Sequence, residues 1–162
     1  MTSAELDIVA DQLGRTPRGV AGVAWRCPCG KPGVVATYPR LEDRTPFPTT
    51  FYLTCPRAVA AVSTLEAEGL MAEWSERLQR DADLAGRYYR AHEHYLAARA
   101  ALGDDDVPEI SGISAGGMPD RVKCLHVLVA HALAAGRGVN PIGDEALERI
   151  GAFWERPCLE ES

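Results

Sequence analysis

The cysteines are the residues whose type and spacing could do chemistry. Cys27 and Cys29 are two positions apart, Cys55 precedes a proline, and Cys124 stands two positions before a histidine. Four thiolates in tetrahedral geometry suit zinc, and four thiolates also suit an iron–sulfur cluster. We therefore predict a metal centre at Cys27, Cys29, Cys55 and Cys124, with zinc as the first candidate cofactor and an iron–sulfur cluster as the alternative. Cys158, in an acidic tail, is taken as the odd cysteine outside this centre.

Two other interpretations of these thiols stay open. Free cysteine is often a small buried hydrophobic residue with no chemical role. Cys55 also precedes an expected helix start, where the helix dipole favours a thiolate over a thiol. We therefore keep Cys55 as a candidate catalytic nucleophile and His126 as a candidate catalytic base.

Helix geometry bears on the fourth ligand. Residues 119–135 are predicted to form a buried, largely apolar helix that contains both Cys124 and His126. At about 100° per residue, two positions place side chains roughly 160° apart around a helix. The two side chains cannot bind one ion unless the helix begins late. We expect Cys124 as the fourth ligand and His126 as a neighbouring base or hydrogen-bond donor, and the sequence leaves the choice between them open.

A glycine-rich segment precedes this helix. Backbone amides, the helix dipole and nearby cations together bind anions well at such places. We predict a pocket for a small anionic ligand here, and an ordinary glycine loop is the alternative. The candidate anion-binding residues are Ser114, Gly116, Gly117, Arg121 and Lys123.

The elements that must position these residues are a small sheet and several helices. Alternating apolar patterns and β-branched residues predict strands at 20–25, 33–38 and 49–54. We expect an α+β fold in which a small antiparallel sheet of about three strands near the N-terminus is packed by five to six helices. We expect one domain over residues 1–162, with an N-terminal helix at 3–14, the sheet region at 18–55, a helical part at 56–154 and a tail at 155–162.

Charge and composition exclude several classes of protein. The chain of 162 residues carries a net charge of -6, which disfavours an extended nucleic-acid surface. Its N-terminus lacks the pattern of a signal peptide, and no stretch is long and apolar enough to cross a membrane. Five cysteines without that export signal indicate thiols in a reducing compartment. We therefore expect a cytoplasmic protein with no membrane contact.

Several short motifs together resemble the bacterial family called domain of unknown function 501, from about residue 7 to residue 150. The motifs are Arg26-Cys-Pro-Cys-Gly30, Leu53-Thr-Cys-Pro56, Lys123-Cys-Leu-His126 and Asn140-Pro-Ile-Gly143. The resemblance implies no activity, because the family name states that none is established. Cys158 lies outside the shared motifs.

Three hypotheses about function follow. The first is a metal-binding protein whose cysteine-rich centre lies beside an anion pocket. The second is a cysteine-dependent enzyme for sulfur or acyl transfer, which uses Cys55 or Cys124 with His126. The third is a non-catalytic interaction module that binds a protein partner. The sequence does not decide whether the protein is an enzyme.

Overall fold

The computed structural model describes residues 1–103 and 107–159 of the chain. The predicted α+β class is confirmed: a three-stranded antiparallel sheet lies near the N-terminus, and the described residues form six α-helices. Residues 104–106 of the predicted helical part and residues 160–162 of the predicted tail lie outside the described residues. Among the described residues, no helix is long and apolar enough to span a membrane.

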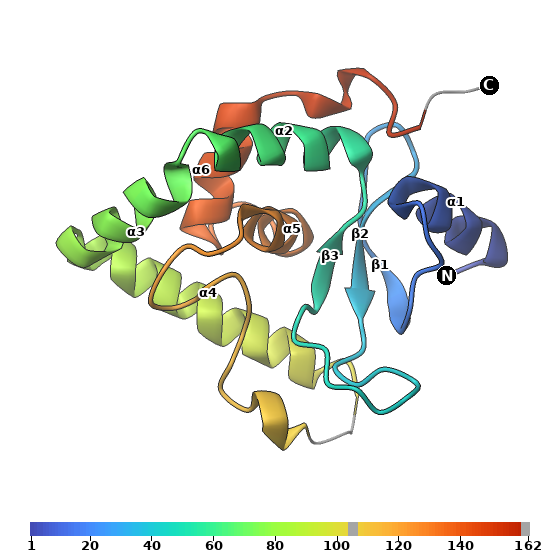
Figure 1. Cartoon of the computed structure of the whole chain (residues 1–162), viewed down its shortest axis with the longest axis horizontal. Coiled ribbons are helices and arrows are strands. Elements are labelled where there is room, and N and C mark those ends of the chain that lie inside the picture. The colour runs from blue at the N-terminus through green and yellow to red at the C-terminus, as the bar shows by residue number, and fades with distance from the viewer. Residues whose placement is uncertain (104–106, 160–162) are drawn as a thin grey trace.

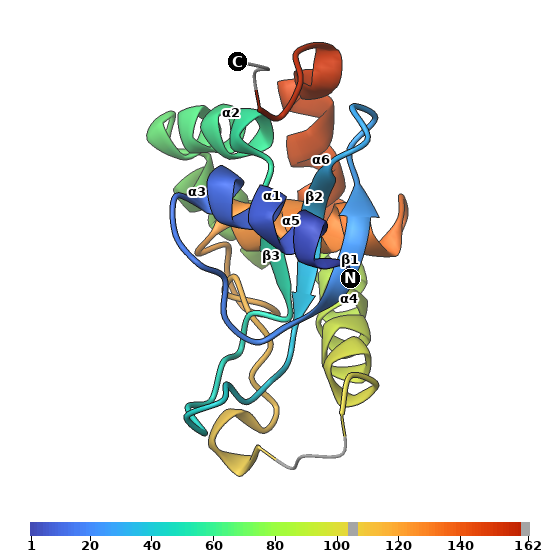
Figure 2. The ribbon, with the colours of Figure 1, turned by 90° about the vertical axis from the view of Figure 1, so that its right-hand side faces the viewer.

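The sheet has the order β1-β2-β3, so β2 is central. Its strands are β1 (Val20–Arg26), β2 (Pro32–Thr37) and β3 (Phe51–Leu53). Every residue of β2 is buried, because the sheet is covered on both faces. Helix α1 (Ser3–Leu13) crosses one face and α5 (Leu125–Ala135) passes behind the other (Figure 2). A strand that is buried on both faces is nearly all apolar, and β2 fits this rule from Pro32 to Ala36, with the buried Thr37 at its end.

Helix α5 lies at the centre of the helical part. Figure 1 shows it nearly end-on, surrounded by β3, α2 (Pro56–Ala67), α4 (Ala82–Ala100) and α6 (Pro141–Ile150), while α3 (Leu70–Arg80) links α2 to α4. Its side chains are buried on most faces, as its apolar sequence predicts. At the crossing with α6, a Cβ atom on Gly143 would overlap the Leu128 carbonyl. Only glycine therefore allows the two helices to approach this closely.

The start of α5 differs from the prediction. We expected a helix from about residue 119, but α5 begins at Leu125, and Cys124 is extended with φ -147° and ψ 109°. The Gly116 carbonyl accepts hydrogen bonds from the amides of Lys123 and Cys124, at 2.8 and 3.4 Å. These hydrogen bonds hold the preceding residues in a turn. Helix α5 therefore begins about one and a half helical turns later in the chain than predicted.

Two side chains of α4 fasten the long loops to the core. The Tyr95 hydroxyl accepts hydrogen bonds from the amides of Thr50 and Phe51, at 2.7 and 3.2 Å. The buried guanidinium of Arg99 donates to the carbonyls of Pro48 and Ser114, at 2.6 and 3.1 Å, and to other carbonyls of the same loops. Backbone groups that no helix or sheet could satisfy are thus paired inside the protein.

Candidate metal centre and a second thiol site

Four cysteines from separate segments gather at one end of the sheet. Cys27 and Cys29 lie on the turn between β1 and β2, and Cys55 lies between β3 and α2. Cys158 follows the short helix η2 (Phe153–Glu155) in the C-terminal segment, which ends beside the β1–β2 turn (Figure 1). The fold therefore brings the C-terminal segment to the thiols of the sheet region.

The four sulfur atoms lie close together. The Sγ atoms of Cys27, Cys29 and Cys158 are all within 4.8 Å of one another, and Cys29 and Cys158 are 3.4 Å apart. Cys55 lies outside this mutual set, but its Sγ is 2.9 Å from that of Cys158. Cys27, Cys55 and Cys158 are buried, and Cys29 is half-buried. Cys27, Cys29 and Cys158 form a group that could hold a metal ion, and together with Cys55 they are called the cysteine cluster below.

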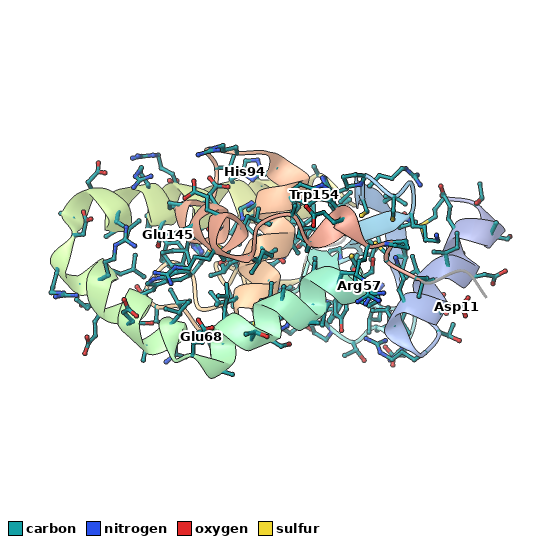
Figure 3. The ribbon with its side chains drawn as sticks, turned by 90° about the horizontal axis from the view of Figure 1, so that it is seen from above. Asp11, Arg57, Glu68, His94, Glu145 and Trp154 are labelled. Atoms are coloured by element: carbon teal, nitrogen blue, oxygen red, sulfur yellow. The ribbon has the colours of Figure 1, made fainter. Side chains whose placement is uncertain are left out.

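Hydrogen bonds to the backbone and one glycine fix the two segments that carry Cys27, Cys29 and Cys158. The Cys27 amide donates to the Lys31 carbonyl at 2.9 Å, and Gly30, at φ 92°, closes the turn between the strands. Glycine adopts this left-handed conformation without strain. Arg57, labelled in Figure 3 at the start of α2, donates to the Pro157 carbonyl at 3.1 Å and holds the C-terminal segment beside the cluster.

The thiols of the cluster differ in their tendency to ionise. Burial raises the pKa of Cys27, and burial together with the neighbouring thiols raises that of Cys158. Burial also opposes ionisation of Cys29, but the amides of Cys158 and Lys31, together with the thiols of Cys27 and Cys158, outweigh burial and lower the Cys29 pKa to about 7. Several thiolates in one buried place repel each other unless a cation lies among them.

The structure places Cys124 in a second, separate group with Glu66 and His126. One ligand atom from each of these residues lies within 4.8 Å of the other two. Because α5 begins only after Cys124, the side chains of Cys124 and His126 are not on opposite sides of a helix. The structure thus differs from the predicted ligand set: it brings Cys158, and not Cys124, to the other three cysteines.

Both ring nitrogen atoms of His126 contact neighbouring polar groups. Its Nδ1 is 3.1 Å from Glu66 Oε1, and its Nε2 is 3.1 Å from Ser63 Oγ and 3.3 Å from the Val59 carbonyl. The second oxygen of Glu66 accepts the Leu125 amide at 3.0 Å. Contact with Cys124 raises the pKa of His126, although burial opposes this, and Glu66 raises it further.

The Cys124 thiol is shifted in the complementary direction. Burial alone raises its pKa, but contacts with His126 and the Val127 amide outweigh burial and lower it below the ordinary thiol value. Cys124 and His126 also line a pocket of about 510 Å³ between α1, β3, α2 and α5. The group therefore joins a thiol of increased acidity to a space that a small molecule could enter.

The family described as "Protein of unknown function (DUF501)" matches residues 23–148 of the chain. The chain belongs to this family. The matched region contains Cys27, Cys29, Cys55 and Cys124, whereas Cys158 lies beyond it. No curated protein and no solved structure matches the chain.

The glycine-rich segment of this DUF501 protein is occupied by its own hydrogen bonds. The Gly117 carbonyl accepts the Arg121 amide at 3.0 Å, and the Gly116 carbonyl accepts that of Lys123 at 2.8 Å. Ser114 is buried and its hydroxyl contacts His92 Nδ1 at 2.7 Å. The amides of Arg121 and Lys123 thus already have acceptors, and no helix begins at this point. The anion pocket stays a prediction, and its geometric basis, a helix start at residue 119, is absent here.

The position of Cys158 beside the other cysteines of this DUF501 protein was not predicted from the sequence, although a signal was present. Aromatic residues precede it, and Phe153 is buried with its ring centroid 6.0 Å from that of Trp25. Trp154, labelled in Figure 3, adds a second ring to the same segment. Two adjacent aromatic residues directly before the predicted tail indicate a segment that docks on the fold, and a docked segment brings the following cysteine with it.

Proposed function

We propose that this protein binds one zinc ion through Cys27, Cys29, Cys55 and Cys158. The observation that supports the proposal best is that three separate segments bring four thiols to one buried place. A buried set of small hydrophobic side chains would not need sulfur atoms at four converging positions. The anion pocket of the first sequence hypothesis is not needed for this function.

The spacing of the sulfur atoms favours a single ion. Zinc–sulfur bonds of about 2.3 Å in a tetrahedron place the sulfur atoms about 3.8 Å apart. The Cys55–Cys158 and Cys29–Cys158 distances of 2.9 and 3.4 Å are somewhat shorter than this value, and Cys27 lies within 4.8 Å of Cys29 and Cys158. Cys55 lies outside the mutual set and would move toward Cys27 and Cys29 to complete the tetrahedron. An iron–sulfur cluster has its thiolates on different iron atoms and separates them further. Zinc therefore fits better than a cluster.

The ion acts structurally in this proposal. Four protein thiolates complete a tetrahedral coordination sphere and leave no position for water or substrate. Three of the four cysteines are buried. The ion would hold the C-terminal segment against the β1–β2 turn and the start of α2. Thiol ligands of this kind persist in a reducing compartment, so we assign the protein to the cytoplasm.

Metal content tests the proposal. Protein purified under anaerobic conditions is expected to contain one zinc per chain by elemental analysis. Cys158→Ala is expected to lose the metal, and Cys124→Ala, a matched control at the cysteine outside the cluster, is expected to keep it. Cobalt substitution gives a second readout, because tetrahedral thiolate coordination produces a strong charge-transfer absorption.

Three results would contradict the proposal. Metal-free protein in which all five thiols react rapidly would show that the cluster is a group of ordinary cysteines. Zinc lost from Cys124→Ala and retained in Cys158→Ala would restore the ligand set expected from the sequence. Brown protein with acid-labile sulfide would establish an iron–sulfur cluster in place of zinc.

A further inference from the structure

The second thiol site lies on the wall of a pocket and is independent of the proposed zinc centre. Cys124 is the N-cap residue of α5 and His126 lies in its first turn, and both line the pocket of about 510 Å³. Glu66 is not among the lining residues and contacts His126 from α2. The thiol and the imidazole therefore face the pocket, and the carboxylate lies behind the imidazole. This is the order that nucleophile, base and orienting group take in cysteine-dependent enzymes.

The hydrogen bonds around the imidazole fix its orientation. Glu66 is itself held by the Leu125 amide at 3.0 Å, and it contacts His126 Nδ1 at 3.1 Å. The Val59 carbonyl, 3.3 Å from Nε2, can only accept a hydrogen bond. With acceptors at both nitrogen atoms, the protonated imidazole is favoured. An imidazolium beside a thiol is the partner that stabilises a thiolate.

Each charged group near Cys124 acts in an identifiable direction. The start of α5 and the His126 imidazolium favour the thiolate, while the Glu66 carboxylate opposes it. The Glu66 charge is partly compensated by the Leu125 amide and by His126. The pKa of Cys124 is lowered on balance.

The residues that line the pocket indicate the chemical class of a substrate. Among the described residues that line it, none is lysine or arginine, and the His126 imidazolium is already paired with Glu66, so the lining does not favour a phosphate or carboxylate. The apolar part of the lining is formed by Leu13, Phe51, Leu53, Val59 and Val127, and threonine, tyrosine and glutamine side chains supply the polar part. Such a lining fits an aliphatic chain with one polar group at its reactive end.

We infer that Cys124 is a nucleophile that accepts an apolar acyl group from an activated acyl donor of the thioester class, with His126 as its acid–base partner and Glu66 as a positioning residue. The Cys124 thiolate attacks the carbonyl carbon of the donor and forms a new carbon–sulfur bond. The bond between that carbon and the leaving sulfur breaks, and the leaving thiolate takes the proton held by His126. The products are S-acyl-Cys124 and a free thiol, with no change of oxidation state.

A second metal site is the alternative use of the same three side chains, since all three are zinc-ligand types. The contacts favour the nucleophile. Both nitrogen atoms of His126 have protein partners, and both oxygen atoms of Glu66 are engaged as well. An ion would have to displace these contacts, whereas the thiol reaction uses them as they are.

Alkylation of the zinc-loaded protein tests the thiolate. Iodoacetamide followed by peptide mass mapping is expected to modify Cys124 and to spare the four cluster cysteines. The rate against pH is expected to have its midpoint below the ordinary thiol pKa of about 8.5. His126→Gln is expected to raise that midpoint, and a midpoint about one pH unit higher lowers the rate at neutral pH about tenfold. A midpoint at the ordinary value in the native protein would overturn the inference.

The proposed effect of Glu66 on His126 is tested by a quantity that would not change if Glu66 only supported the fold. Glu66→Gln keeps an oxygen acceptor for the Leu125 amide and removes the charge beside His126. The His126 pKa, followed by NMR of its ring protons, is expected to fall toward the ordinary value in this variant. An unchanged His126 pKa would remove Glu66 from the site.

Acyl transfer is tested with p-nitrophenyl hexanoate and its acetyl analogue as probes. We expect S-hexanoyl-Cys124 by mass mapping, with kcat/KM for release of nitrophenol about tenfold higher for hexanoate than for acetate, because the longer chain fills the apolar lining. Cys124→Ala and Cys124→Ser are both expected to abolish the modification. Circular dichroism shows whether each variant is folded.

Thr64 serves as the matched control, because it is an exposed hydroxyl residue of α2 that donates to the Ala60 carbonyl and does not line the pocket. Thr64→Ala is expected to be acylated like the native protein. Acylation on Ser63, equal rates for the two esters, or a second zinc bound by Cys124 would each overturn the inference. The outcome is separable from the zinc proposal, because mass mapping locates Cys124 whether or not the cluster holds metal.

Discussion

Zinc bound at the four-cysteine cluster should stabilise the native fold by an amount that depends on the free zinc concentration. A ligand that binds the native state alone adds RT ln(1 + [L]/Kd) to the free energy of unfolding. Free zinc at one hundred times Kd should therefore add about 2.7 kcal/mol, and each further tenfold increase about 1.4 kcal/mol. The perturbation is a change from a zinc-buffered solution to one that contains a chelator.

The structure indicates why the native state is the form that binds. Cys55 and Cys158 are 103 positions apart, so an unfolded chain rarely brings them together. The C-terminal segment is otherwise held by the Arg57 contact to Pro157 and by the packing of Phe153 on Trp25. Removal of zinc should therefore loosen this segment before the rest of the fold.

Urea unfolding in zinc buffers measures the global effect, and amide hydrogen exchange of residues 153–158 measures the local one. Cys158→Ala should make the free energy of unfolding independent of zinc, and Cys124→Ala should keep the dependence of the native protein. A native protein that contains zinc but has the same unfolding free energy in zinc and in chelator would refute the reasoning. In that case the ion would bind the folded and unfolded chains equally.

Three other perturbations test the fold around the site. Burial lowers the pKa of His131 to about 3 from an ordinary value near 6.5, so the stability it contributes is complete above about pH 6.5 and is lost as pH falls toward 3. The free energy of unfolding should fall by up to about 1.4 kcal/mol per pH unit in that window, and His131→Gln should flatten the slope in urea titrations at acid pH. Arg99→Lys keeps the charge but cannot reach all the carbonyls that Arg99 now satisfies, so chemical denaturation should show a loss of about 3 kcal/mol; a loss below about 1 kcal/mol would contradict this. Gly143→Ala inserts a methyl group where α5 and α6 cross, and the same assay should show a loss of about 1–3 kcal/mol, with an unchanged stability as the contrary result.

Local sequence pattern was enough to predict the sheet and the burial of α5. The three strands lie within a few residues of the predicted segments, because β-branched runs bounded by turns specify strands directly. The start of α5 was not predictable in this way. It depends on the Gly116 carbonyl, which accepts two amides from seven and eight residues later in a turn that no helical periodicity encodes.

The candidate site, too, could be predicted only in part from the local sequence pattern. Cys27, Cys29 and Cys55 follow strand ends, and strand ends that meet at one edge of a sheet could be inferred from the sequence. Cys158 comes to them only through the docking of the C-terminal segment on Trp25 and α2, which is tertiary packing. The pairing of Cys124 with Glu66 likewise joins residues 58 positions apart through the contact of α5 with α2.

The position of Cys158 in the chain also determines when the proposed zinc centre could be completed. A ribosome releases Cys27, Cys29 and Cys55 early, and these three alone leave a coordination position open. The fourth sulfur emerges only after α5 and α6 have been made, since it follows both in the chain. The proposed zinc ion could therefore gain its fourth ligand only late in synthesis, and a chain interrupted before residue 158 would lack that ligand.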